Sequence, residues 1–78
     1  MDTFTKNVVR QALIEYVDAR APNILEYDNP TDDHVKDHLE DYVNARYVSQ
    51  TEAFRSEQMN RIVPRIQAAI AEIQRLRN

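Results

Sequence analysis

The chain contains no cysteine, no glycine and no tryptophan, and only three prolines among its 78 residues. Without cysteine it can form neither a disulfide framework nor a thiolate metal site, and it suits a reducing compartment. Without glycine it lacks the residue that most easily adopts left-handed turns, so tight hairpins are disfavoured. A glycine-rich loop that cradles phosphate is excluded for the same reason. These absences predict an all-α protein.

Long apolar runs are also missing. No stretch approaches the roughly 20 apolar residues that span a bilayer, and the first residues lack the basic and then apolar pattern of a signal peptide. Hydrophobic residues make up 42% and charged residues 29%, which is ordinary for a folded domain. The length allows one hydrophobic core. We therefore expect a soluble, cytoplasmic, single helical domain over residues 1–78 with no membrane contact.

Turn and cap signals divide this domain into three segments. Pro22 ends the first helix, because the residue before a proline is disfavoured in the helical region. Asn29 or Thr31 can cap the second helix, and Ser49 with Glu52 matches a capping box at the start of the third. The apolar residues between the first two helices predict a connection that packs over one end of a bundle. The expected helices cover residues 3–20, 30–47 and 50–77.

The third segment has the clearest periodicity. Apolar residues recur at alternating spacings of three and four, as in a coiled coil. Pro64 lies inside this pattern, and because the register passes through it unbroken we favour one long, kinked helix over a break that opens a fourth helix at Pro64. At 1.5 Å per residue this helix approaches 40 Å and the others about 25 Å. Two short helices would leave part of the apolar stripe uncovered, so we expect a homodimer, unless the kink folds the last turns back onto the domain. The expected oligomer interface is Met59, Ile62, Ile66, Ile70, Ile73 and Leu76.

An internal similarity relates the first two helices. Residues 9–20 and 35–46 share six of twelve positions, including a tyrosine and a final arginine. Chance similarity of two amphipathic helices is one explanation, and duplication or selection for two equivalent faces is the other. The first helix carries Val8 and Ile14 where the second carries His34 and Glu40. This difference predicts that the first helix lies more centrally and the second is more exposed.

Charge is distributed unevenly along the chain. Residues 24–41 contain seven acidic residues and one lysine, whereas residues 53–78 contain five arginines and two glutamates. The two regions could attract each other within the fold or across a dimer, or they could serve a partner. The acidic side chains of the second helix lie on the face opposite its apolar stripe. That face could be merely a solvated surface, or a carboxylate surface that docks on a basic partner; its residues are Asp33, Asp37, Glu40, Asp41 and Asn44.

Other chemistry has weaker support in the sequence. His34 and His38 have the spacing of two metal ligands on one helix, yet Val35 stands where a zinc protease has glutamate, and we expect no metal and no cofactor. The arginines of the third helix could contact phosphate, but few aromatic residues accompany them and the net charge is −3. The serines, Ser49 and Ser56, lie in or near a helix cap and not beside a histidine as a nucleophile would. We expect no enzyme activity.

The sequence thus predicts a three-helix, dimeric bundle that acts by protein–protein contact. In size, absence of glycine and acidic face it resembles the small accessory proteins with which phages and mobile elements inhibit host machinery, although it shares no motif with them. Two alternatives stay open. One is a small DNA- or RNA-binding regulator that uses the arginine-rich third helix, and the other is a structural subunit whose role is to oligomerise.

Overall fold

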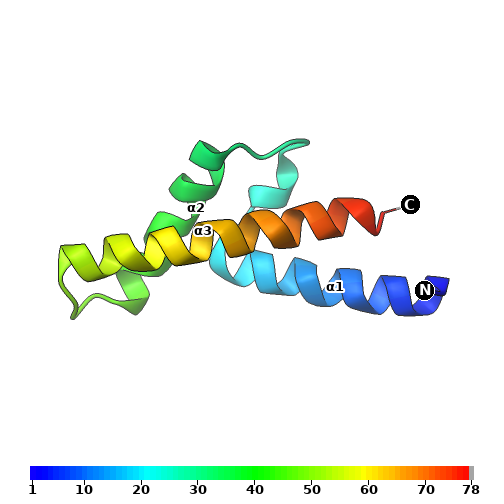
Figure 1. Ribbon diagram of the computed structural model, residues 1–78, viewed down its shortest axis with the longest axis horizontal. Helices are drawn as coiled ribbons and strands as arrows, with labels where there is room; N and C mark the ends of the chain where they lie inside the picture. The colour runs from blue at the N-terminus through cyan, green and yellow to red at the C-terminus, as the bar shows by residue number, and fades with distance from the viewer. Residues whose placement is uncertain (78) are drawn as a thin grey trace.

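The computed structural model describes residues 1–77 and contains three α-helices and one short 3-10 helix in this part of the chain, with no strand. Figure 1 shows α1 and α3 side by side, with α2 crossing them obliquely. The all-α prediction is confirmed, as is the division into three helices. The elements in order are α1 (Thr3–Arg20), η1 (Ile24–Glu26), α2 (Asp32–Arg46) and α3 (Glu52–Arg75).

Helix α1 begins and ends at residues suited to those places. The side chain of Asp2 accepts a hydrogen bond of 2.7 Å from the backbone N–H of Thr5, which satisfies one of the free donors of the first turn. After Arg20 the chain turns at Asn23, whose φ of 69° is left-handed. Asparagine tolerates this conformation better than most residues, and here it does what glycine does in other proteins. The chain can therefore turn sharply without any glycine.

The connection between α1 and α2 is part of the core, as its apolar residues predicted. Ile24, in η1, is fully buried, and Leu25 packs against the same cluster. Tyr27 stacks on His34, with ring centroids 3.8 Å apart. The backbone carbonyl of Asp28 accepts a hydrogen bond from the side chain of Gln74, which joins the connection to the end of α3. The connection is thus fixed to both neighbouring helices.

The starts of α2 and α3 test two capping predictions. Thr31 caps α2, as one of the two candidates. The predicted capping box of Ser49 and Glu52 is wrong: Thr51 is the cap of α3, and its hydroxyl accepts from the N–H of Phe54 at 3.1 Å. Residues 47–50 instead form a turn, closed by a hydrogen bond from the Gln50 N–H to the carbonyl of Tyr47. The cap is therefore Thr51, directly before the helix, and not Ser49, which lies within the turn.

Helix α3 continues through Pro64 without interruption, so the alternative of a fourth helix beginning at Pro64 is wrong. Pro64 lacks the N–H that would bond to the carbonyl of Asn60, and both residues are exposed. Water can therefore bond to the freed carbonyl, which explains why a proline is tolerated on this side of the helix. The kink itself stays a prediction.

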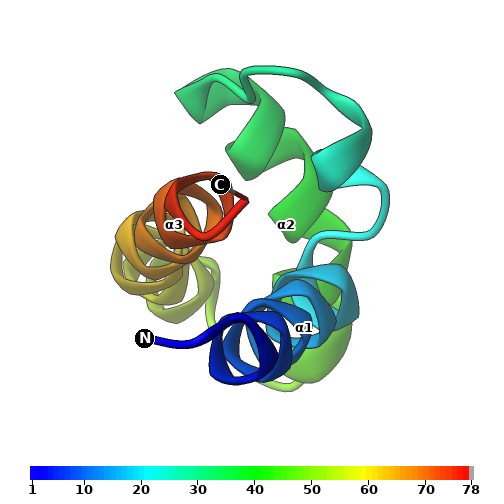
Figure 2. The same ribbon diagram turned by 90° about the vertical axis from the view of Figure 1, so that its right-hand side faces the viewer.

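The core is organised around α3. Both other helices pack along it and contact each other far less, an arrangement visible end-on in Figure 2. Helix α2 contributes three buried residues and α1 only Val17. The prediction that α1 is the more central of the two is wrong, because its N-terminal turns extend along the outer end of α3 and bury no residue. The buried apolar residues are Val17, Ala21, Ile24, Val35, Leu39, Val43, Val63, Ile66, Ala69, Ile70, Ile73 and Leu76.

The resulting molecule is elongated, with extents of 45 × 20 × 17 Å. The long dimension follows from α3, whose 24 residues span about 36 Å. Among residues 1–77 no helix combines the length and the apolar character needed to cross a membrane.

Candidate functional site

The acidic face of α2 consists of Asp33, Asp37, Glu40, Asp41 and Asn44. At 100° per residue, these five positions fall within an arc of about 100° on one side of the helix. All five side chains are exposed. The structure therefore places every residue of the predicted surface together, on the outer side of α2.

The carboxylates of this face have no partner in the described part of the chain. The ion pairs there join Arg61 to Glu57 and Arg75 to Glu72, both pairs within α3. The acidic middle and the basic end of the sequence thus do not neutralise each other inside residues 1–77. Hydrogen bonds link these regions instead: the side-chain amide of Gln67 donates to Asp32, and that of Gln74 donates to the backbone carbonyl of Asp28, both outside the acidic face.

Helix α2 holds the acidic face rigidly because its opposite side is anchored in the core. Val35, Leu39 and Val43 are at most 1% exposed and pack against α3. They recur at a spacing of four residues, which keeps one side of the helix apolar while the other side carries the charges. The acidic face is thus a fixed array and not a set of loop residues.

The first turn of α2 is held by a capping box in which a histidine takes the place of glutamate. The hydroxyl of Thr31 accepts from the N–H of His34 at 3.2 Å, and Nδ1 of His34 accepts from the N–H of Thr31 at 3.1 Å. An imidazole nitrogen that accepts carries no proton, so the proton of the neutral ring lies on Nε2. Tyr27 covers the ring by stacking. These contacts fix the beginning of the acidic face.

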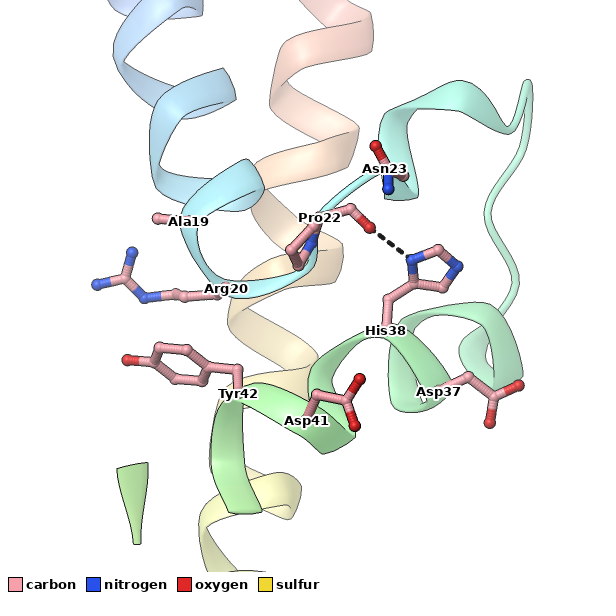
Figure 3. A pocket seen from close by; sticks show the side chains of 8 residues that line it. All are labelled: Ala19, Arg20, Pro22, Asn23, Asp37, His38, Asp41 and Tyr42. Carbon is pink, nitrogen blue, oxygen red and sulfur yellow. Dashed lines mark hydrogen bonds between the residues drawn. The ribbon is translucent and has the colours of Figure 1, made fainter. Parts of the chain in front are cut away.

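A shallow groove of about 560 Å³ runs along one side of the acidic face, between α2 and the end of α1 (Figure 3). Asp37 and Asp41 line it from α2. The opposite wall includes Arg20, whose guanidinium lies 4.0 Å above the ring of Tyr16 and donates to the Tyr16 carbonyl at 3.0 Å. The remaining lining residues are Ala19, Pro22, Asn23, His38 and Tyr42.

Figure 3 shows how this groove is held together. Nδ1 of His38 lies 2.7 Å from the carbonyl oxygen of Pro22, and since that oxygen can only accept, the imidazole nitrogen donates. This bond joins α2 to the end of α1. A cationic side chain entering the groove would meet the carboxylates of Asp37 and Asp41, whereas the ring of Tyr42 already has the guanidinium of Arg20 5.9 Å from its centre.

A second groove lies on the other side of the acidic face, between α2 and α3. Asp37 and Glu40 line it, with Lys36 beside them. The wall formed by α3 mixes polar and apolar side chains and carries no charge. It consists of Ser56, Met59, Asn60, Val63, Pro64 and Gln67. The acidic face is therefore a ridge between two shallow grooves, a shape that can enter a concave basic surface.

The two histidines of α2 each use one ring nitrogen within the fold. The Nδ1 atoms of His34 and His38 are engaged with the backbone, and the ring of Tyr27 lies against both imidazoles, stacked on one and edge-on to the other at 5.5 Å. Among residues 1–77 no group of three or more histidines and carboxylates is arranged to hold a metal ion.

The predicted oligomer interface lies largely inside the single chain. Ile66, Ile70, Ile73 and Leu76 are between 0% and 7% exposed, and the three isoleucines belong to one core cluster with residues of α1, η1 and α2. Met59 and Ile62 are half-buried and pack against the same core. A second copy on α3 was expected because part of its apolar stripe would otherwise be exposed to water. That reason does not apply to the four buried residues, since α1 and α2 pack along different parts of α3 and Ile24 of the connection joins the same core.

The arginines of α3 do not form a continuous basic surface. Arg61 and Arg75 are paired with glutamates on the same helix, and Arg55 donates to the carbonyls of Tyr47 and Gln50 at the turn before α3. Glu72 holds the pKa of Arg75 above its usual value, chiefly through their hydrogen bond. Much of the positive charge of α3 is thus used within the fold.

Sequence reasoning missed the groove beside the acidic face because its walls come from separate helices. The internal similarity was a partial signal, since Tyr16, Arg20 and Tyr42 are among its matched residues. Arg20 also caps the C-terminal end of α1 through its hydrogen bond to the Tyr16 carbonyl. No protein-family model, no curated protein and no solved structure matches the chain significantly.

Proposed function

We propose that this protein is a non-enzymatic interaction module that binds a basic protein surface through the acidic face of α2. The observation that carries the proposal is the absence of any ion pair on four exposed carboxylates held on one anchored helix. Side-chain charges that meet no opposite charge in their own fold are available to a partner. Such an array attracts a basic partner over a distance and aligns it on arrival.

The geometry favours a protein partner over a nucleic acid. The exposed charge of the described surface is negative along α2, and the arginines that could contact phosphate are partly neutralised by neighbouring glutamates. The ridge between two grooves offers a basic partner carboxylates on both of its sides. Inhibition of a partner that normally binds nucleic acid is one outcome of such docking, since carboxylates would then occupy the place of phosphates. We place this activity in the cytoplasm, in keeping with a chain that needs no disulfide.

A capture experiment with matched variants tests the proposal. The full chain is immobilised and incubated with nuclease-treated lysate of the source organism, and bound proteins are identified by mass spectrometry. The test variant combines Asp37→Asn, Glu40→Gln and Asp41→Asn. The control variant carries the same change in net charge elsewhere, as Asp18→Asn, Glu26→Gln and Asp28→Asn.

The proposal expects a basic protein that binds the wild type and the control variant but not the test variant, and whose binding weakens as salt is raised. Equal capture by both variants would show that position on α2 does not matter, and would refute the acidic face as the binding surface. Retention of nucleic acid in a parallel experiment without nuclease would favour the regulator that uses α3.

A further inference from the structure

A small cavity of about 270 Å³ lies between α1, α3 and the connection that joins α1 to α2. Each of these three elements contributes apolar side chains to its lining: Ile14, Leu25, Ile70 and Ile73. The two isoleucines of α3 are buried, and the other two residues pack against the same core cluster. The cavity is therefore an opening at the edge of the hydrophobic core.

Two arginines line the same cavity, Arg10 from α1 and Arg77 from the end of α3. Arg10 lies one helical turn before Ile14, and Arg77 lies one turn after Ile73. Because α1 and α3 run antiparallel, with the start of α1 and the end of α3 at the same end of the molecule (Figure 1), both displacements are in the same direction. Both arginines thus lie on the outer side of the apolar lining.

These two arginines have no partner in the described part of the chain. Among residues 1–77, neither Arg10 nor Arg77 makes a hydrogen bond, an ion pair or a contact with an aromatic ring. By contrast, several other arginines are paired with glutamates or bonded to backbone carbonyls. Arg10 is also half-buried, so water reaches its guanidinium only in part. A charge that is partly withdrawn from water and meets no opposite charge is stabilised by a bound anion.

The charge of the lining indicates which kind of anion fits. Asp28 is the one carboxylate among the lining residues, so the cavity carries two positive charges and one negative charge. An anion with a single charge neutralises this site, whereas a phosphate monoester carries about −1.5 to −2 at neutral pH. A carboxylate has one charge, and its two oxygens match the forked donors of a guanidinium. A carboxylate is therefore the better match.

The wall formed by the connection is fixed by contacts of its own. The side-chain amide of Gln74 donates to the backbone carbonyl of Asp28 at 3.3 Å, which joins this wall to α3. Tyr27, another lining residue, stacks on His34 of α2. The cavity is thus formed before any ligand arrives, and binding does not have to order a loop.

We propose that this cavity binds a small amphipathic carboxylate, with its apolar tail along the buried isoleucines of α3 and its carboxylate bonded to Arg10 and Arg77. The volume lies just below the range of about 300–1,000 Å³ that is typical of ligand cavities, so the ligand is small. Ile70 and Arg77 are separated by about 10 Å along α3, which suits an aliphatic acid of medium length. Burial of the tail supplies affinity, and the arginines select the charge.

Titration of the isotope-labelled full chain with sodium octanoate, followed by NMR, tests the inference. Octanoate should bind saturably at millimolar concentration or below, with the largest shifts at the amides of Ile14, Leu25 and Ile73. Octanol has the same tail without the charge and should bind at least about tenfold more weakly, because the charged hydrogen bonds are missing. Octyl phosphate should also bind more weakly than octanoate.

Variants of the two arginines identify the site. Arg10→Gln and Arg77→Gln should each weaken octanoate binding about tenfold or more and leave octanol binding unchanged. Arg77 lies beyond the end of α3, so its replacement does not interrupt a helix. Arg65→Gln is the matched control and should bind octanoate like the wild type. Arg65 is exposed on α3, also lacks a partner among residues 1–77, and does not line the cavity. Circular dichroism of each variant confirms that the helices are folded.

Several results would overturn the inference. Equal affinity for octanol and octanoate, or unchanged octanoate affinity in either Arg10→Gln or Arg77→Gln, would show that the arginines do not recognise a carboxylate. Tighter binding of octyl phosphate would refute the choice of head group. No saturable binding in the millimolar range, or shifts confined to residues outside the cavity, would refute the site. None of the lining residues belongs to the acidic face, so these results are independent of the proposed function.

Discussion

Replacing Ile66 with alanine distinguishes a core residue of one chain from a residue that joins two chains. Ile66 is fully buried within the monomer, near the middle of α3. An isoleucine-to-alanine change at such a site removes the transfer free energy of the deleted carbons and leaves a cavity, at a cost of about 2–5 kcal/mol. A 78-residue domain has a total stability of roughly 4–12 kcal/mol. The substitution should therefore remove a large share of the stability of the fold.

Urea unfolding followed by circular dichroism at 222 nm measures the effect. With a slope of about 1 kcal/mol per molar urea for a domain of this size, a loss of 3 kcal/mol lowers the midpoint by roughly 3 M. The measurement is made at two protein concentrations fifty-fold apart. Val48→Ala, at an exposed site, should change the stability by less than about 0.5 kcal/mol.

The core assignment of Ile66 predicts the same loss at both concentrations. A loss below about 1 kcal/mol would contradict burial within the single chain. A midpoint that rises with protein concentration, and does so less for Ile66→Ala, would instead restore the dimer interface on α3 that the heptad spacing suggested.

Three further predictions concern the helix ends and the acidic face. Thr31→Ala removes the cap of α2 and should cost about 1 kcal/mol in urea unfolding, whereas Thr31→Ser should keep most of that stability. The pKa of Asp2 lies below its ordinary value of 3.8, chiefly because the backbone N–H of Thr5 bonds to its carboxylate. The stabilisation of α1 by Asp2 is thus present above the unfolded pKa and is lost as the pH falls through the lower folded value. The Thr5 amide signal in NMR should therefore shift below about pH 4, and the absence of such a shift would refute this assignment. Asp2→Asn is the control, because its side chain does not titrate. Asp37→Asn should raise the free energy of unfolding slightly, by about 0.2–0.5 kcal/mol for each like-charge repulsion one turn away that it removes, and added salt should shrink that gain. A loss of stability would mean that Asp37 has a stabilising partner.

Several features could be predicted from the sequence because they depend on local interactions. The absence of glycine and the position of Pro22 indicated helices and the end of the first one, and both hold in the structure. Thr31 was one of two predicted caps because a hydroxyl one residue before a helix bonds to its first turn. The acidic residues of α2 could be placed on one face because helical periodicity alone fixes which side chains point the same way.

The failed capping prediction has a local cause, whereas the other failures come from packing between segments distant in sequence. Ser49 with Glu52 has the spacing of a capping box, but the turn closed by Tyr47 and Gln50 places the helix start at Thr51. The greater apolar content of α1 suggested a central position, yet apolar content does not say where along a neighbour a helix lies. Helical periodicity likewise places the apolar residues of α3 on one side of the helix, but it does not show whether the same chain or a second copy covers them.

The amino-acid sequence by itself determined the helices of this protein, their approximate ends and the acidic face of α2, since each depends on residues within a few positions of one another. Only the tertiary structure decided that α3 is the centre, that its isoleucines are covered within one chain, and that the outer side of α1 is not. Which apolar side chains are buried depends on the lengths, positions and crossing angles of helices that are far apart in the sequence, and local periodicity does not determine these.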